Sequence, residues 1–102
     1  MKKILLCCAA GMSTSLLVSK MEQAAKEQNI ESKIWAVSIE DLSNNLKLGV
    51  NVVLLGPQIR YKLNEVKKIC DEKNIPVEVI NMIDYGSMNG KNVLKFAFDL
   101  IK

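Results

Sequence analysis

Residues 3–8 read KILLCC and residues 9–15 read AAGMSTS, and the junction between these two stretches decides the fold. The first stretch is almost wholly apolar, as expected of a strand that is buried on both faces of a parallel sheet. The second is small and polar, and from position 12 to position 28 apolar side chains recur at helical spacing. The sequence therefore predicts a buried strand that ends at Cys8, a tight loop and then a helix.

Apolar runs and amphipathic segments keep alternating to the end of the chain. We expect further strands at 33–38, 50–55 and 76–80, helices at 38–47, 58–73 and 93–101, and a turn at 84–90. Alternating strands and helices imply parallel pairing through right-handed crossovers. The prediction is one α/β domain over residues 1–102, with an open four-stranded parallel sheet in the order 2-1-3-4 and helices on both faces.

A sheet in this order has a switch point between its first and third strands, where a crevice opens beyond their carboxyl ends. Cys8 falls at the rim of that crevice. The turns at 56–58 and 84–86 follow the third and fourth strands at the same edge. Three segments that are distant in the sequence are therefore expected to converge beside this thiol.

The loop after Cys8 has the composition of an anion site, because its residues are small or carry hydroxyls and lead into a helix N-terminus. The expected phosphate-binding residues are Ala9, Ala10, Gly11, Met12, Ser13, Thr14 and Ser15. Such a setting also favours a thiolate, so Cys8 is the candidate nucleophile. The alternative is that Cys8 packs as a small hydrophobe. That alternative suits Cys7 and Cys70, which fall within a strand and on an apolar helical face.

Side chains in the two later turns are candidates for contact with the bound group or with a partner. Gln58 either donates to a phosphate oxygen or caps its helix, and Arg60 either turns toward the crevice or stays solvated. Tyr61 and Tyr85 are expected at the rim. Asp84 is more typical of a turn residue than of a general acid.

Composition excludes several other functions. The 102 residues include no histidine, and the three cysteines lack metal-ligand spacing, so we expect no metal, no cofactor and no disulfide. The formal charge of +3 is scattered, which argues against nucleic-acid binding. The first apolar run is too short for a signal peptide or a membrane span, which predicts a cytoplasmic protein without direct membrane insertion.

Three segments, CAAGMSTSLLV at 8–18, VVLLGPQI at 52–59 and PVEVI at 76–80, resemble enzyme IIB of the lactose, cellobiose and N,N'-diacetylchitobiose branch of the bacterial sugar phosphotransferase system. The resemblance implies that Cys8 accepts a phosphoryl group from the phosphohistidine of enzyme IIA. It also implies delivery to a β-linked disaccharide that enters through the membrane component, enzyme IIC.

The same family resembles low-molecular-weight tyrosine phosphatases around this loop, where a Cys-x5-Arg pattern places an arginine on the phosphate. Here the sixth residue after Cys8 is Thr14, which favours a transferable phosphothiol over rapid hydrolysis. A small cysteine-dependent phosphatase and a thiol-based redox or regulatory module remain as alternatives. The first needs an arginine at position 14, and the second needs a resolving cysteine. The sequence identifies neither the sugar nor the oligomeric state.

Overall fold

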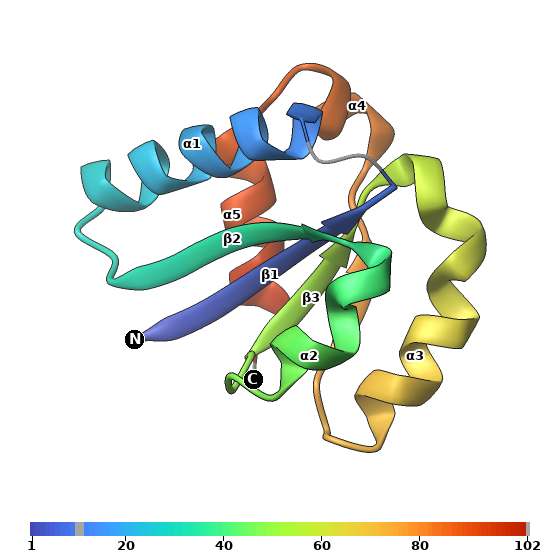
Figure 1. Ribbon diagram of the computed structural model, residues 1–102. Coiled ribbons are helices and arrows are strands. Elements are labelled where there is room, and N and C mark those ends of the chain that lie inside the picture. Colours follow the sequence, from blue (N-terminus) through green and yellow to red (C-terminus); the bar gives the residue numbers. More distant parts are fainter. Residues whose placement is uncertain (10–11, 102) are drawn as a thin grey trace.

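Four parallel strands in the order β2-β1-β3-β4 form the centre of the computed structural model, as the sequence predicts (Figure 1). The structure describes residues 1–9 and 12–101, without the side chains of Met12 and Ser13. The elements are β1 (Lys2–Cys8), α1 (Met12–Glu27), β2 (Ser32–Ser38), the 3-10 helix η1 (Ile39–Asp41), α2 (Leu42–Leu46), β3 (Val52–Leu55), the 3-10 helix η2 (Pro57–Lys62), α3 (Leu63–Asp71), β4 (Val77–Val79), α4 (Met82–Gly86) and α5 (Gly90–Leu100).

Helices cover both faces of this sheet. The side chains of β1 alternate between two hydrophobic clusters, because successive residues of a strand point to opposite faces. Ile4 and Leu6 pack with α1 and α5 on one face. Leu5 and Cys7 pack with α2 and α3 on the other. β1 thus joins the two cores, and Cys8 is its last residue.

Helices α1 and α3 end in the same way, at an asparagine with positive φ. Asn29 has φ 56° and Asn74 has φ 57°, a conformation that asparagine tolerates better than most residues. After each asparagine the chain turns back, so that the N–H of Ile30 donates to the carbonyl of Ala25 at 2.9 Å. The helical spacing over positions 12–28 agrees with α1, which ends at Glu27 just before this turn.

Three expected segments differ from the observed elements. The turn expected at 84–90 begins instead with the helix α4, because the side chain of Asn81 accepts hydrogen bonds from two N–H groups of its first turn. The helix expected over 58–73 starts as the 3-10 segment η2, where Ile59 is non-helical at φ −116°. The helix expected over 38–47 is divided into η1 and α2. Ser38 makes no capping bond to the backbone there, since its hydroxyl donates to Asp41 Oδ2 at 3.4 Å.

The helices α1 and α5 cross in very close contact at Gly90. An added Cβ at this position would lie 2.4 Å from the backbone carbon of Lys20 and 2.6 Å from the nitrogen of Met21. Only a glycine lets the two backbones approach this closely. The crossing fixes α5, and with it the preceding helix α4, against α1.

Across residues 1–9 and 12–101, none of the helices combines the length and the apolar character that crossing a bilayer would require.

Candidate functional site

Three segments meet at the carboxyl edge of the sheet, where β1, β3 and β4 end. The N–H of Gly56, just after β3, donates to the carbonyl of Cys7 at 2.9 Å. The N–H of Ile80, just after β4, donates to the carbonyl of Leu55 at the same distance. These bonds hold the two later turns beside the end of β1 and form the convergence that the sequence predicts.

Cys8 ends β1 at this edge and is 2% exposed, so it is buried rather than open at the rim of a crevice as expected. A Cβ added to Gly56 would lie 3.6 Å from the Cβ of Cys8 and 2.9 Å from Oε1 of Gln58. The side chains of Cys8, at the end of β1, and Gln58, on η2, therefore both lie close to Gly56. The thiol and the amide belong to the same small region of the edge.

The other two cysteines are core residues, as the sequence predicts. Cys7 and Cys70 are both 0% exposed and belong to the apolar cluster on the α2 and α3 side. Burial, with smaller contributions from the neighbouring thiols, raises the pKa of Cys7 to about 12. Burial, with Asp71 nearby, raises the pKa of Cys70 to about 11. Neither thiol is ionised near neutral pH, so neither is a candidate nucleophile.

The loop after Cys8 is described only in part. Ala9 is exposed, as is Ser15 in the first turn of α1. The expected phosphate-binding residues Ala10 and Gly11 lie outside the described part of the chain, as do the side chains of Met12 and Ser13. The structure therefore shows where the loop begins and ends, at the last residue of β1 and the first residue of α1.

Thr14 differs from Ser15 because it is completely buried, at 0% exposure. Its Oγ1 lies 3.2 Å from the phenolic oxygen of Tyr85, and either atom can be the donor. Tyr85, expected at the rim, is only 7% exposed and belongs to the core on the α1 and α5 side. The expectation placed Tyr85 in a turn, whereas α4 directs its side chain inward toward Thr14.

The candidates Arg60 and Tyr61, which follow β3, stay near the surface. Tyr61 is 75% exposed. Nη1 of Arg60 donates to the carbonyl of Pro57 at 3.1 Å, so the guanidinium is held on its own turn. Asp84 Oδ1 accepts from Nδ2 of Asn92 at 3.1 Å, which links α4 to α5.

A hollow of about 330 Å³ lies between η2 and α4, beside the Cys8 edge. Its lining residues are Pro57, Gln58, Arg60, Met82, Tyr85 and Gly86. Met82 and Ile83 are large apolar residues that are 67% and 78% exposed. Sequence reasoning did not identify them. Two apolar residues directly after the capping residue Asn81 were the available signal.

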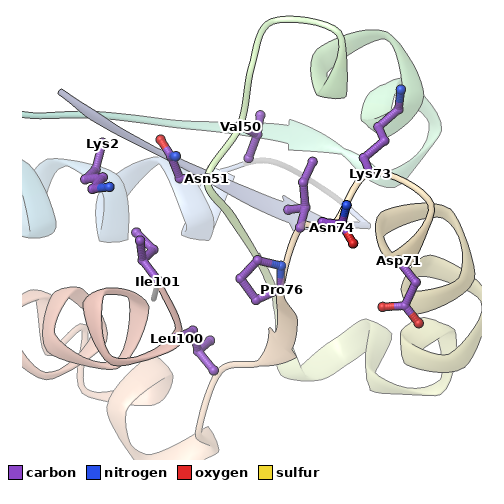
Figure 2. A pocket seen from close by; sticks show the side chains of 10 residues that line it. Lys2, Val50, Asn51, Asp71, Lys73, Asn74, Pro76, Leu100 and Ile101 are labelled. Carbon is purple, nitrogen blue, oxygen red and sulfur yellow. The ribbon is translucent and has the colours of Figure 1, made fainter.

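A larger hollow, of about 610 Å³, lies at the opposite edge of the sheet (Figure 2). Lys2, Asn51 and Pro76 line it near the amino ends of β1, β3 and β4. Ligands of open parallel α/β sheets bind outside the carboxyl ends of the strands. The larger hollow therefore lies at the amino edge of the sheet, whereas the candidate functional site, with Cys8, lies at the carboxyl edge.

Comparison with solved structures assigns the architecture to a class. The lactose-specific IIB component domain from Streptococcus pneumoniae superposes with a TM-score of 0.88 over 99% of this chain and 98% of that one, at 16% identity, which establishes a shared fold. The cellobiose-specific phosphotransferase IIB component from Borrelia burgdorferi has a TM-score of 0.81 and 45% identity over 98% of this chain and 91% of that one. The four-stranded parallel sheet is thus that of phosphotransferase IIB domains.

The chain belongs to the lactose/cellobiose-specific IIB subunits of the PTS system, whose family model matches residues 3–96. It is 44% identical to the oligo-beta-mannoside-specific EIIB component of Bacillus subtilis, over 99% of this chain and 97% of the relative. Two Lactococcus lactis relatives each cover 98% of this chain and 96% of their own length. They are a galactose-specific EIIB component at 46% identity and a cellobiose-specific one at 45%.

Proposed function

We propose that this protein is a phosphoryl carrier in which Cys8 accepts phosphate from the phosphohistidine of an enzyme IIA. Cys8 then donates it to a β-linked disaccharide that enters through the membrane enzyme IIC. The observation that carries the proposal is the position of Cys8, at the carboxyl end of the central strand and directly before the loop that opens α1. Membership of the IIB family supports the same relay.

The proposed reaction has two balanced steps. In the first, the P–N bond of the donor breaks and an S–P bond forms at Cys8, while the proton lost by the thiol is taken up by the released imidazole. In the second, the S–P bond breaks and an O–P bond forms on a sugar hydroxyl, whose proton returns to the sulfur. Because these 102 residues contain no histidine, the phosphohistidine of the donor lies outside them.

The surroundings of Cys8 favour acceptance of an anion. The first four N–H groups of a helix have no partner within the helix, and the helix dipole is positive at that end. In our proposal the backbone N–H groups of residues 9–15 receive the phosphoryl oxygens, together with the hydroxyls of Ser13, Thr14 and Ser15. Thr14 stands where a phosphatase of similar architecture has an arginine, which favours a carrier over a hydrolase.

The partners would reach Cys8 from the carboxyl edge. Gln58, Arg60 and Tyr61 follow β3 there and are exposed. Tyr61 presents a large apolar surface, and tyrosine and arginine are enriched where proteins meet. We therefore assign these three residues to contacts with IIA and IIC. Such contacts must be brief, because one thiol has to meet two partners in turn.

The sugar is assigned only as a class. Two of the relatives are named for β-linked sugars, oligo-beta-mannoside and cellobiose, and a third for galactose. Their identities to this chain differ by only a few per cent, so selection of the sugar resides mainly in IIC. A β-linked disaccharide is the class we propose.

The test is phosphorylation of purified protein by a phosphorylated enzyme IIA, followed by intact-mass measurement. Wild type should gain one phosphoryl group and lose it when vesicles that contain IIC and the disaccharide are added. Cys8→Ser should gain none, whereas Cys7→Ala, which removes the adjacent buried thiol, should be phosphorylated like wild type. Labelling of Cys8→Ser at the wild-type level would refute the proposal.

A further inference from the structure

We propose that Tyr85 is a positioning residue of the Cys8 loop and acts through the hydroxyl of Thr14. The two oxygens lie 3.2 Å apart, although the residues are separated by 71 positions in the sequence. The inference rests on the proposed phosphoryl relay, because it concerns how the loop receives the phosphoryl group.

Both hydroxyls are buried, where a polar group without a hydrogen-bond partner destabilises the fold. Thr14 is 0% exposed and Tyr85 is 7% exposed. Burying a hydroxyl without a partner is unfavourable, while replacing both partners by apolar groups of the same shape can be nearly neutral. A valine and a phenylalanine would fill this space without polar atoms. The hydrogen bond between the two hydroxyls therefore fixes the position of the chain more than it stabilises the fold.

Thr14 is placed where small movements matter for anion binding. It lies in the first turn of α1, which begins at Met12, only a few residues after Cys8. The N–H groups of this turn lack helical partners and are the ones that an anion bound by the loop would face. A bond that fixes Thr14 also fixes the direction of those donors.

The other end of the bond is held firmly. Asn81 Oδ1 accepts from the N–H groups of Ile83 at 2.8 Å and of Asp84 at 3.3 Å, which fixes the start of α4. Asp84 in turn accepts from the side chain of Asn92 on α5. Tyr85 thus extends from a braced helix, and α5 is itself packed on α1 at Gly90. The Tyr85 hydroxyl thus links this helix to the first turn of α1.

The direction of this hydrogen bond adds a chemical role. A threonine hydroxyl has one proton, so it can serve an anion only when its neighbour supplies the proton between the two oxygens. When Tyr85 donates to Thr14, the proton of Thr14 remains available for a phosphoryl oxygen. A chain of two hydroxyls that ends on an anion also polarises cooperatively. Donation from Tyr85 therefore holds the Thr14 oxygen in place while leaving its proton for the phosphoryl group.

The test compares Tyr85→Phe with wild type, because phenylalanine keeps the ring and removes only the hydroxyl. Phosphorylation is measured with two donors, a phosphorylated enzyme IIA and the small donor phosphoramidate. The expected result is a rate about 5–10-fold lower with both donors, as for the loss of one hydrogen bond between uncharged groups. The ³¹P chemical shift of the phosphorylated variant should also differ from that of wild type.

Ser87→Ala is the matched control, since Ser87 donates only within the end of α4, to the carbonyls of Ile83 and Asp84. It should leave the rate and the ³¹P shift unchanged. Two further variants test the same bond from the loop side. Thr14→Ser should stay within about twofold of wild type, whereas Thr14→Val should lose as much as Tyr85→Phe, and the double variant Thr14→Val, Tyr85→Phe no more than either.

Wild-type rates and ³¹P shift in Tyr85→Phe would overturn the inference and leave the relay intact. A loss seen only with enzyme IIA, with an unchanged ³¹P shift, would make Tyr85 a partner contact and also overturn it. If Tyr85→Phe does not fold, equal rates for Thr14→Ser and Thr14→Val give the same negative answer. Failure of wild type to gain phosphate from either donor would instead refute the proposed function.

Discussion

The two faces of the sheet carry cores of different kinds. On the α1 and α5 side the core includes two bonded hydroxyls and a helix crossing so close that only glycine fits at Gly90. On the α2 and α3 side the core is apolar except for two thiols, Cys7 and Cys70, whose pKa values are raised to about 12 and about 11. On the face that borders the Cys8 loop, a hydrogen bond and a close helix crossing fix the positions of side chains and helices. The opposite face mainly buries apolar side chains and thiols.

The contrast separates Cys8, the nucleophile in our proposal, from the two other thiols of the chain. Cys7 and Cys8 are adjacent, yet Cys7 points into the α2 and α3 core and Cys8 lies against Gly56 at the edge of the sheet. Alternation along a strand is sufficient to separate them. Four experiments test this difference between the faces, in order of decreasing effect.

The largest expected effect is on the reactivity of the buried thiols. Iodoacetamide reacts with thiolates, and a rise in pKa of two to three units lowers the thiolate fraction about 100- to 1,000-fold. At pH 8 Cys70 and Cys7 should therefore be alkylated at least about a hundredfold more slowly in the native protein than in urea, measured by mass spectrometry of peptides. Rapid native labelling of either would contradict the burial-only role of that face.

The next effect concerns the helix crossing on the other face. Gly90→Ala would force the backbones of α1 and α5 apart, because the added carbon would lie 2.4 Å from the backbone of Lys20. We expect a loss of about 3 kcal/mol in the free energy of unfolding, measured with urea. Gly86→Ala is the matched control, since a Cβ there meets nothing within 4 Å, and it should be near neutral. Equal stability of the two variants would disprove the close crossing.

Alkaline pH should weaken the α2 and α3 face. Below pH 9 the two thiols are protonated in both states, so they contribute no pH dependence. Above pH 9 the unfolded chain loses these protons, while the folded chain keeps them up to about pH 11 at Cys70 and about pH 12 at Cys7. The free energy of unfolding should therefore fall by about 1.4 kcal/mol per pH unit for each thiol. Cys70→Ala should show a shallower fall between pH 9 and 11 in parallel urea titrations.

The smallest expected effect concerns the N-cap residues that precede two short helices. Asn81 caps α4 with bonds to two N–H groups, whereas Ser38 makes no such bond at η1. Asn81→Ala should lower the free energy of unfolding by about 1 kcal/mol, and Ser38→Ala should change it by less than about 0.5 kcal/mol. Thermal unfolding of the two variants measures the difference. A larger loss for Ser38→Ala would reverse the comparison.

The sheet order and the place of Cys8 follow from the sequence because they depend on local patterns. Unbroken apolar runs, helical periodicity and the end of the first helix at Asn29 are all visible within short windows, and the rules of parallel connection then leave the order 2-1-3-4. The convergence of the turns at Gly56 and after β4 follows from that order alone.

The partnership of Thr14 with Tyr85 could not be predicted in this way. Tyr85 was expected at the rim because the segment around it contains turn residues, and nothing in its immediate neighbours reveals that Asn81 starts a helix there. A single hydrogen bond across 71 residues leaves no periodic signal. The direction of a side chain on a five-residue helix depends on tertiary packing, which one sequence does not display.

The position of β1 in the middle of the sheet has a consequence for synthesis. This strand is made first, yet β2 provides only one of its two neighbours, and the pairing with β3 must wait until residue 55 has left the ribosome. Until then the fully buried residues Ile4 to Cys7 lack part of their cover. Exposed apolar strands are prone to aggregate, so the nascent chain is most vulnerable between completion of β2 and emergence of β3.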